Sequence, residues 1–271
     1  MLNKQPAPPQ AKKGYTRRVP ADGKPRRERA DKRVVDAGLA DSRNRAQALI
    51  LAGQVVIGDH AVAKPGDLVD AAAPVRLKGD PLPYVSRGGL KLVHALDHFA
   101  IDVRGQRGLD VGASTGGFTD VLLQRGAVAV VALDVGTNQL AHKLRQDPRV
   151  TSIEQTNARS FDVATLPFVP DIVVCDVSFI SLTIILPKLV EAAGRGGKPI
   201  IALVKPQFEV GKGEVGKGGV VREPEKRQAA VDKCVACARE LGCEVIGVVE
   251  SPITGPAGNV EYLLFVRTPA D

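Results

Sequence analysis

The sequence predicts an α/β protein in which a small α+β module precedes a seven-stranded, mostly parallel sheet. The 271 residues are 44% apolar and 25% charged, which is a globular composition. From residue 108 onward, seven short apolar runs alternate with helical stretches, a pattern typical of a parallel sheet covered by helices on both faces. Residues 28–82 instead contain two short helical patterns and a few short strands, which predicts a very small separate domain.

The formal net charge of +7 lies entirely in the first 27 residues. This segment carries eight basic side chains and one acidic one, so the rest of the chain has 37 less eight, or 29, basic and 30 less one, or 29, acidic side chains. The segment has almost nothing to bury, and residues 1–27 are predicted to be a disordered arm. A basic arm on a neutral body indicates a polyanionic partner, and the alternative is a solubilising tail.

Several classes of protein are excluded by the composition. Four Cys residues do not support a disulfide-stabilised miniprotein, and no run of 18 uncharged apolar residues supports a membrane span. The N-terminus is basic but lacks the apolar segment of a signal peptide, so we expect a cytoplasmic protein with no membrane partner. The oligomeric state is not predicted.

The elements of the small module follow from local patterns. A first helix is predicted to end near Gly38, and Asp41 or Ser42 can cap a second helix whose apolar residues follow helical spacing. Two short strands flank Gly58 and Asp59, a pair suited to a two-residue hairpin turn.

The larger domain begins with a helix near Lys91, and its strands follow. The last two strands lie close together around Pro252 and Gly255, so we expect them to pair as an antiparallel edge of the sheet. The predicted strands are 108–111, 128–133, 150–153, 172–175, 200–204, 245–249 and 262–266.

A strand, a Gly-rich turn and a helix start follow one another around residues 109–118. Gly112, Gly116 and Gly117 allow the backbone to approach a ligand closely. Asp134 ends the next strand, where a carboxylate can accept hydrogen bonds from both ribose hydroxyls of an adenosine. The turn lacks the G-x-G-x-x-G spacing of a dinucleotide site, so S-adenosyl-L-methionine is favoured over NAD.

Three other motifs have simpler explanations. The loop 211–218 nearly forms a P-loop, but glycine stands where Ser or Thr would bind magnesium. Cys234 and Cys237 form a C-x-x-C without a second ligand pair, which fits a buried helix face better than a zinc site. His94 and His98 lack the Glu of H-E-x-x-H and are interpreted as the polar face of their helix.

Charged side chains stand at the ends of four predicted elements. Asp176 and Lys205 directly follow strands, so they emerge at the carboxyl edge, where open α/β sheets bind ligands. Glu261 precedes the last strand and can reach the same edge if that strand runs antiparallel, and Lys91 begins the helix before the nucleotide-binding unit. Buried charges are costly unless paired, so two lysines and two acids converging there would neutralise one another.

Segments spread over most of the chain carry a family resemblance. They are 86–92, 112–119, 156–159, 176–182, 204–212 and 258–262, together with 29–31, 42–50 and 64–65 near the N-terminus. Taken in chain order, they resemble the TlyA, or haemolysin A, family over about residues 28–267. The resemblance implies an S4 RNA-binding domain over residues 28–82 and an FtsJ-like, Rossmann-like class I methyltransferase domain over residues 83–271.

The resemblance also implies an activity and a set of site residues. Members of the family transfer a methyl group from S-adenosyl-L-methionine to a ribose 2′-hydroxyl, usually of cytidine, in 16S or 23S ribosomal RNA. The implied partners are ribosomal RNA or ribosomal subunits, and no metal is implied.

The catalytic tetrad would be Lys91, Asp176, Lys205 and Glu261. The cofactor contacts would be Gly112, Ser114, Gly116, Gly117, Phe118, Asp134, Asn157 and Asp176. The RNA contacts would be Arg29, Arg43, Arg45 and Lys64.

Within the tetrad, Lys205 is expected to act directly on the 2′-hydroxyl. A free lysine has a pKa near ~10.4 and is mostly protonated at neutral pH, so removal of the proton and cationic orientation of the hydroxyl both remain open. Asp176 is expected to hold Lys205 and the methyl donor, while Lys91 and Glu261 hold the ribose.

Three other functions were weighed against methyl transfer. An RNA-binding assembly factor with little catalysis would not need all four tetrad residues. A pore-forming haemolysin would need an amphipathic or membrane-spanning segment, which the sequence does not show. An NAD-linked oxidoreductase is disfavoured by the spacing of the Gly-rich turn.

Deleting residues 1–27 is expected to weaken RNA binding and to flatten its salt dependence, while binding of S-adenosyl-L-methionine stays unchanged. The deletion removes eight basic side chains. Each lost phosphate contact lowers the slope of log K against log salt by roughly 0.7 to 0.9. RNA titrations at several salt concentrations measure this slope, and an unchanged slope would identify the arm as a solubilising tail.

Overall fold

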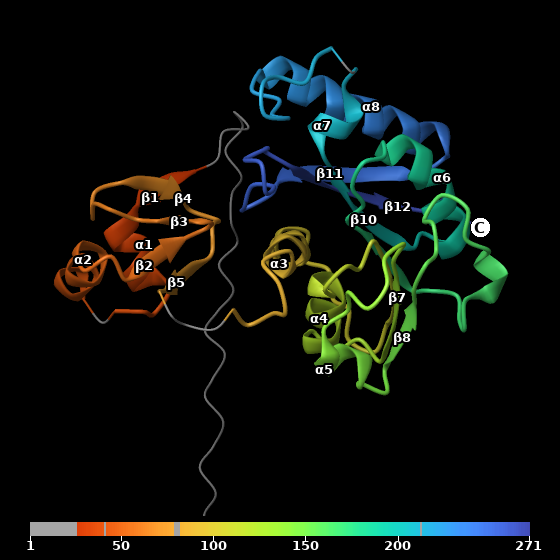
Figure 1. Cartoon of the computed structure of the whole chain (residues 1–271), viewed down its shortest axis with the longest axis horizontal. Helices are drawn as coiled ribbons and strands as arrows, with labels where there is room; N and C mark the ends of the chain where they lie inside the picture. The colour runs from red at the N-terminus through yellow and green to blue at the C-terminus, as the bar shows by residue number, and fades with distance from the viewer. Residues whose placement is uncertain (1–25, 41, 79–81, 212) are drawn as a thin grey trace, which may run out of the picture.

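The computed structural model describes most of the chain beyond the predicted arm (Figure 1). Arg27 begins strand β1 (Arg27–Arg29) and pairs with Asp70, and the Arg26 main-chain oxygen accepts a hydrogen bond from the Ala71 amide, so the folded module starts two residues earlier than predicted. The rest of the predicted arm lies outside the described residues, apart from Arg26. The described residues are 26–40, 42–78, 82–211 and 213–271.

The predicted boundary between residues 82 and 83 stays a prediction. It adjoins residues 79–81, which also lie outside the described part of the chain.

An N-terminal module of residues 26–78 forms its own small core. β1 and β4 make an antiparallel pair, and β3, β2 and β5 make a three-stranded antiparallel sheet. Apolar side chains from both helices of the module and from β2 pack together and form this core. The elements after β1 are α1 (Ala30–Asp36), α2 (Arg43–Leu51), β2 (Val55–Ile57), β3 (His60–Ala61), β4 (Leu68–Asp70) and β5 (Val75–Leu77).

Two local predictions in this module are confirmed. Ser42 caps α2, since its hydroxyl oxygen accepts a hydrogen bond from the Arg45 amide at 3.2 Å. Asp41, the alternative cap, lies outside the described residues. Gly58 and Asp59 form the turn between β2 and β3, and the φ of +62° at Gly58 is one that glycine adopts without strain.

The larger domain is built on one seven-stranded sheet in the order β11-β12-β10-β9-β6-β7-β8. The five strands from β10 to β8 are parallel, whereas β12 runs antiparallel to both β10 and β11. The predicted antiparallel edge is therefore confirmed. The strands are β6 (Arg107–Val111), β7 (Ala129–Leu133), β8 (Val150–Ile153), β9 (Ile172–Cys175), β10 (Pro199–Val204), β11 (Glu244–Glu250) and β12 (Tyr262–Arg267).

Helices cover both faces of this sheet (Figure 1). Along β9, Val173 and Cys175 pack in the core with α6 and α8, while Ile172 and Val174 pack in the core with α3 and α4. Burial on both faces explains why the central strands are continuously apolar in sequence. The helical elements are α3 (Gly89–His98), α4 (Gly117–Gln124), α5 (His142–Arg145), the 3₁₀ turn η1 (Val163–Thr165), α6 (Leu182–Ala193), α7 (Pro206–Glu209) and α8 (Pro224–Glu240).

The direction of β12 decides which charged residues meet at the edge of the sheet. Val204, the last residue of β10, lies opposite Tyr262, the first residue of β12. The next residue outward on each strand is Lys205 on one and Glu261 on the other, so the two face the same edge. Within the described part of the chain, none of the helices has the length and apolar character to cross a membrane.

Candidate active site

Four charged side chains from four elements meet at the carboxyl edge of the sheet. Lys91 comes from the first turn of α3, Asp176 follows β9, Lys205 follows β10, and Glu261 precedes β12. Lys91 Nζ lies 2.6 Å from Glu261 Oε2 and 3.5 Å from Asp176 Oδ2. Lys205 Nζ lies 2.6 Å from Asp176 Oδ1. The structure thus brings all four predicted tetrad residues together in a chain of alternating charge.

The four side chains differ in exposure. The side chains of Glu261, Lys91 and Lys205 are 1%, 8% and 9% exposed, whereas that of Asp176 is 20% exposed. Asp176 is therefore the tetrad member most accessible to a ligand.

The paired charges shift the pKa of two members in directions that keep them ionised. Burial alone would raise the pKa of Asp176, but the ammonium groups of Lys91 and Lys205 outweigh it and hold that pKa below its ordinary value. Burial alone would lower the pKa of Lys91, but the charges of Asp176 and Glu261 outweigh it and raise that pKa. Asp176 and Lys91 are therefore charged at neutral pH.

Lys205 has a second partner that the sequence did not assign. Its ammonium group donates a hydrogen bond to Ser178 Oγ at 2.8 Å. Ser178 stands two residues after Asp176, so one short loop supplies both partners of Lys205. The motif 176–182 indicates that this loop is part of the site, but the sequence does not show which of the loop's side chains reaches Lys205.

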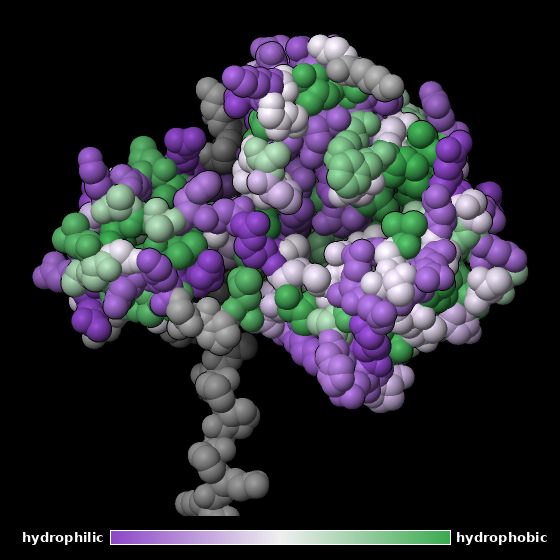
Figure 2. All heavy atoms as spheres, in the orientation of Figure 1, coloured by the Kyte–Doolittle hydropathy of each residue, from purple (hydrophilic) through white to green (hydrophobic). Residues whose placement is uncertain are grey.

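A cavity of about 530 Å³ opens beside the tetrad at the carboxyl ends of the strands. The surface is hollowed between the parts of the domain that carry α7 and α4, with hydrophilic side chains in the hollow (Figure 2). Five predicted cofactor residues line this cavity, together with the unpredicted Phe179: Gly112, Ser114, Asp134, Asn157, Asp176 and Phe179.

Gly112 is required at its position for two reasons. Its φ is +84°, and a Cβ built on it would lie 2.7 Å from the main-chain oxygen of Asp176. The turn after β6 can therefore approach the loop after β9 only with glycine at residue 112. Ser114 also has a positive φ, of 48°, and its amide donates to Asp134 Oδ2 at 2.8 Å.

Asp134 is held with its carboxylate at the cavity wall. Oδ2 accepts the Ser114 bond, and Oδ1 accepts a hydrogen bond from the Gly136 amide at 2.7 Å. A carboxylate has about four acceptor sites, so Asp134 retains acceptors for ligand hydroxyls. Asn157 also lines the cavity, and its side-chain oxygen accepts a hydrogen bond from the Arg159 amide at 2.9 Å.

Three other predicted cofactor residues do not line the cavity. Gly116 has a φ of +92° and a Cβ there would collide with Leu144 and Leu140. A Cβ on Gly117 would collide with Ser86 and Gly89, so this glycine permits close packing of α3 on α4. Phe118 is 3% exposed and packs in the core. The structure gives all three a packing role, which motif matching could not separate from ligand contact.

Glu209 is a buried residue whose role the sequence did not show. Its carboxylate accepts hydrogen bonds from Ser181 Oγ at 2.5 Å and from the Leu182 amide at 2.6 Å, and it lies 3.4 Å from Lys233 Nζ. These contacts tie α7 to the N-terminus of α6, where a negative charge is favourable. The segment between Asp176 and α6 is thereby anchored at its far end.

Comparisons with known proteins agree with the fold. A family model described as FtsJ-like methyltransferase matches residues 84–268, and an S4 domain model matches residues 28–74. The chain is 52% identical over 247 residues to the 16S/23S rRNA (cytidine-2'-O)-methyltransferase TlyA of Mycobacterium tuberculosis, covering 91% of this chain and 92% of that protein. This chain belongs to the TlyA family of FtsJ-like methyltransferases.

Two further relatives carry another name. The chain is 40% identical over 236 residues to Hemolysin A of Brachyspira hyodysenteriae, covering 87% of this chain and 98% of that protein. A solved structure from Streptococcus thermophilus, described as a hemolysin, aligns with a TM-score of 0.68 and 44% identity over 90% of each chain.

Membership of a methyltransferase family implies S-adenosyl-L-methionine as the cofactor. The residues present fit this cofactor, since the cavity has a suitable volume and Asp134 offers acceptors for ribose hydroxyls. Asp110, in β6 behind the Gly-rich turn, is fully buried and does not line the cavity, and its Oδ1 has no hydrogen-bond partner among the described residues.

In the S4 domain, a buried carboxylate organises two of the four predicted RNA contacts. Asp31 is fully buried and accepts hydrogen bonds from Arg29, at 2.8 and 3.1 Å, from Arg43, at 3.0 and 3.3 Å, and from Gln47, at 3.1 Å. The hydrogen bond from Arg29 is the largest cause that holds the pKa of Asp31 well below its usual range. Both guanidinium groups remain about half exposed beside this anchor.

The other two predicted RNA contacts lie outside the Asp31 cluster. Lys64 is exposed and lies in the same turn as Gly66. This turn is beside Arg29, because a Cβ on Gly66 would lie 3.3 Å from the Arg29 guanidinium. Arg45 is exposed two residues after Arg43 in α2, and residues two apart on a helix point in different directions. The structure therefore groups Arg29, Arg43 and the Lys64 turn, and it places Arg45 apart from them.

Gly112→Ala is expected to weaken S-adenosyl-L-methionine binding at least about tenfold, because the new Cβ would displace the Asp176 loop. Gly105→Ala is the matched control: its φ is +73°, but a Cβ there meets nothing within 4 Å. The control should lose only the left-handed backbone cost of ~1–2 kcal/mol. Calorimetric titration and urea unfolding measure the two effects, and equal cofactor affinity in both variants would contradict the assignment.

Asp110 is expected to make the cofactor-free protein less stable as pH rises from about 4 to 7. Burial raises the pKa of Asp110 to about 7, despite two hydrogen bonds from Thr119. In the unfolded chain this group ionises near ~3.9, so the folded state holds the extra proton in that interval and loses its advantage as pH rises. Asp110→Asn should therefore gain stability relative to wild type between pH 4 and pH 7. If the free energies of unfolding of the two proteins change with pH in parallel across this interval, the raised pKa of Asp110 is contradicted.

Proposed function

We propose that this protein transfers the methyl group of S-adenosyl-L-methionine to the ribose 2′-hydroxyl of a cytidine in 16S or 23S ribosomal RNA. The observation that supports it best is the chain of alternating charges from Glu261 to Lys205 beside the cofactor cavity. The Mycobacterium tuberculosis relative is named for this reaction.

When bound, S-adenosyl-L-methionine supplies an electrophilic methyl group on its sulfonium. The 2′-oxygen would take this methyl group, the thioether would leave with the electrons of the carbon–sulfur bond, and the hydroxyl proton would pass to solvent or to a neutral amine. A hydroxyl is a poor nucleophile at neutral pH, so the protein has to place its oxygen and manage its proton.

Lys205 is the residue that we assign to the reacting oxygen. Its ammonium group donates a hydrogen bond to Ser178 and forms an ion pair with Asp176 at 2.6 Å. A lysine ammonium group has three N–H donors, so a donor remains for the ribose oxygen, where it would stabilise the negative charge that develops as the proton passes to solvent. The neutral amine would instead take the proton itself.

The other tetrad members position Lys205. Asp176 contacts both lysines, and Lys91 in turn is held by the buried Glu261. Two cations and two anions sum to zero, so the tetrad adds no net charge to the site. It fixes the geometry at the oxygen, and positioning of that kind can lower a barrier by several kcal/mol.

Phe179 is proposed to hold the nucleobase of the target nucleotide. Phe179 is 91% exposed and lines the cavity. Its φ of +65° is unusual for an aromatic residue. Its ring lies 5.3 Å from that of Phe208, measured between centroids. Exposed aromatic rings beside a catalytic cavity offer a face on which an unstacked base can stack.

The S4 domain supplies the surface that recognises the RNA. Arg29 and Arg43, fixed by Asp31, and the turn that carries Lys64 present cations suited to phosphate groups. A guanidinium that is already held loses less conformational freedom when it binds.

Lys205→Ala is expected to lower the single-turnover rate of methyl transfer at least ~10²-fold, because it removes the group at the reacting oxygen. The assay uses radiolabelled S-adenosyl-L-methionine and ribosomal subunits from a strain that lacks the gene. Lys188→Ala, in α6 and paired with Glu191, is the control and should keep the rate.

Mapping of 2′-O-methyl groups in matched strains identifies the nucleotide. Subunits that take up no label from the wild-type protein would contradict the function, and full labelling by Lys205→Ala would contradict the mechanism. Lys205→Arg keeps the positive charge but does not accept a proton at neutral pH, so it separates orientation from proton removal.

A further inference from the structure

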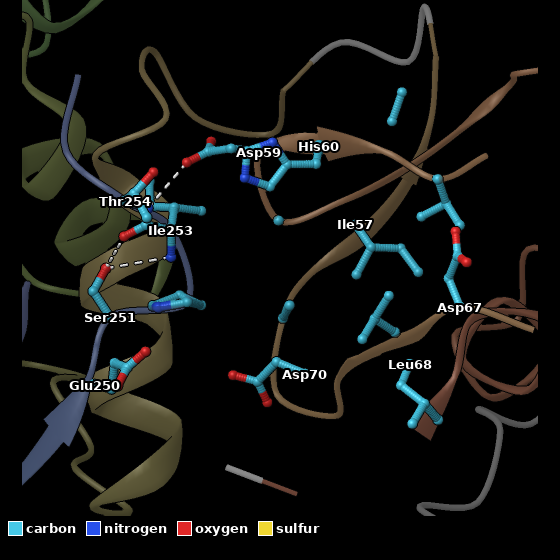
Figure 3. A pocket seen from close by; sticks show the side chains of 16 residues that line it. Ile57, Asp59, His60, Asp67, Leu68, Asp70, Glu250, Ser251, Ile253 and Thr254 are labelled. Atoms are coloured by element: carbon cyan, nitrogen blue, oxygen red, sulfur yellow. Dashed lines mark hydrogen bonds between the residues drawn. The ribbon is translucent and has the colours of Figure 1, made fainter. Parts of the chain in front are cut away.

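The S4 domain contacts the methyltransferase domain through the tip of one hairpin. Asp59 stands in the turn between β2 and β3, and its side chain is only 8% exposed. Its Oδ1 accepts a hydrogen bond from the Arg87 guanidinium at 2.6 Å, and its Oδ2 accepts one from the Thr254 main-chain amide at 3.1 Å. Figure 3 shows Asp59 directed across the junction toward Thr254. One carboxylate thus joins three segments of the chain.

The two segments that Asp59 holds are those that lead to Lys91 and Glu261. Arg87 lies four residues before Lys91, in the turn that starts α3, and its main-chain oxygen accepts from the Leu90 amide at 3.0 Å. Any displacement of Arg87 is therefore transmitted to the first turn of the helix that carries Lys91.

Thr254 lies in the loop between β11 and β12, which ends at Glu261. The next residue, Gly255, donates its amide hydrogen to the Asn259 main-chain oxygen at 2.9 Å. A Cβ on Gly255 would lie 2.5 Å from Glu261 Oε1, so this loop is packed directly against the Glu261 carboxylate. The bond from Thr254 to Asp59 therefore fixes a loop that has no room to move without moving Glu261.

Apolar packing does not fill this junction. A cavity of about 360 Å³ separates the side of the hairpin from the loop 250–254 (Figure 3). Close contact is concentrated at the turn, where a Cβ on Gly58 would lie 3.1 Å from the main-chain oxygen of Pro252. The polar contacts of Asp59 therefore carry much of the connection between hairpin and loop.

The other two tetrad residues are held differently. Asp176 and Lys205 directly follow β9 and β10, which are paired in the middle of the sheet. Their positions depend on the methyltransferase domain alone. Lys91 and Glu261 contact each other at 2.6 Å, and each is preceded by a segment bonded to Asp59.

We propose that Asp59 is a positioning residue that couples the S4 domain to methyl transfer by holding the segments that carry Lys91 and Glu261. This inference rests on the proposed function and adds a regulatory element to it. Movement of the hairpin when the S4 domain binds RNA acts on one half of the tetrad, while the half held by the sheet stays in place. RNA docking on one domain thereby adjusts the catalytic geometry in the other.

The test compares Asp59→Asn, Asp59→Ala and Arg87→Ala in the full-length protein. Asn keeps the shape of Asp but loses the charge that binds Arg87, and Arg87→Ala removes the same contact from the other domain. The control is Asp36→Asn, an exposed acid of the S4 domain that pairs with Lys32. The substrate is ribosomal subunits from a strain that lacks the gene, and affinities for RNA and for S-adenosyl-L-methionine are measured separately.

The single-turnover rate at saturating RNA and cofactor is expected to fall by about tenfold or more in Asp59→Ala and Arg87→Ala, because small displacements of positioned groups cost up to ~10²-fold. Asp59→Asn should fall less, and the control should be unchanged. RNA and cofactor affinities should remain within about twofold of wild type, so the loss appears in kcat and not in KM. The double variant should lose no more than Asp59→Ala alone, because Asp59→Ala already removes the Arg87 contact together with the Thr254 contact.

Two results would overturn the inference. One is an unchanged saturating rate in both alanine variants while the wild-type protein methylates the subunits. The other is a loss confined to RNA affinity, which would make Asp59 a stabiliser of the S4 domain. A wild-type protein that does not methylate the subunits would instead contradict the proposed function, so the two failures are distinguishable.

Discussion

Two acidic and two basic side chains in contact at the sheet edge are the constraint on which the rest of this structure depends. Removing a charge from water costs several kcal/mol, and that cost is offset only while each ion keeps its partners. Glu261 and Lys91 are almost fully enclosed, so neither can lose the other. The order Lys205, Asp176, Lys91, Glu261 leaves no like charges adjacent, and it requires four separate elements to arrive at one point.

Buried acids that hold exposed groups recur elsewhere in the molecule. Asp31 lies beneath two arginines and a glutamine on the S4 domain, and Glu209 holds the start of α6. Asp59 does the same between the two domains. In each case a short acidic side chain accepts two or more hydrogen bonds and fixes segments that apolar packing alone would leave less well defined. Recognition, catalysis and their connection thus rely on one kind of interaction.

The hydrophobic periodicity and the turn residues predict much of the fold, but they do not predict the contacts of particular residues such as Phe118 and Asp59. The seven strand predictions agree with the structure to within one residue at each end, because the central strands are buried on both faces. Phe118 follows the Gly-rich turn like a cofactor residue, yet it packs in the core. The sequence predicts Asp59 only as a turn residue, because its partners Arg87 and Thr254 are 28 and 195 residues away along the chain.

The sequence by itself determined the order of elements, the family and the four charges of the tetrad, since these depend on local patterns and on motifs read along the chain. Tertiary structure alone decided which charges touch. Lys91 and Glu261 are 170 residues apart, and they meet because β12 runs antiparallel to β10 and α3 begins beside it. Likewise, only the packing of the hairpin on the loop before Glu261 shows that the S4 domain reaches the catalytic residues. Contacts of this kind depend on three-dimensional distance, which spacing along the chain does not encode.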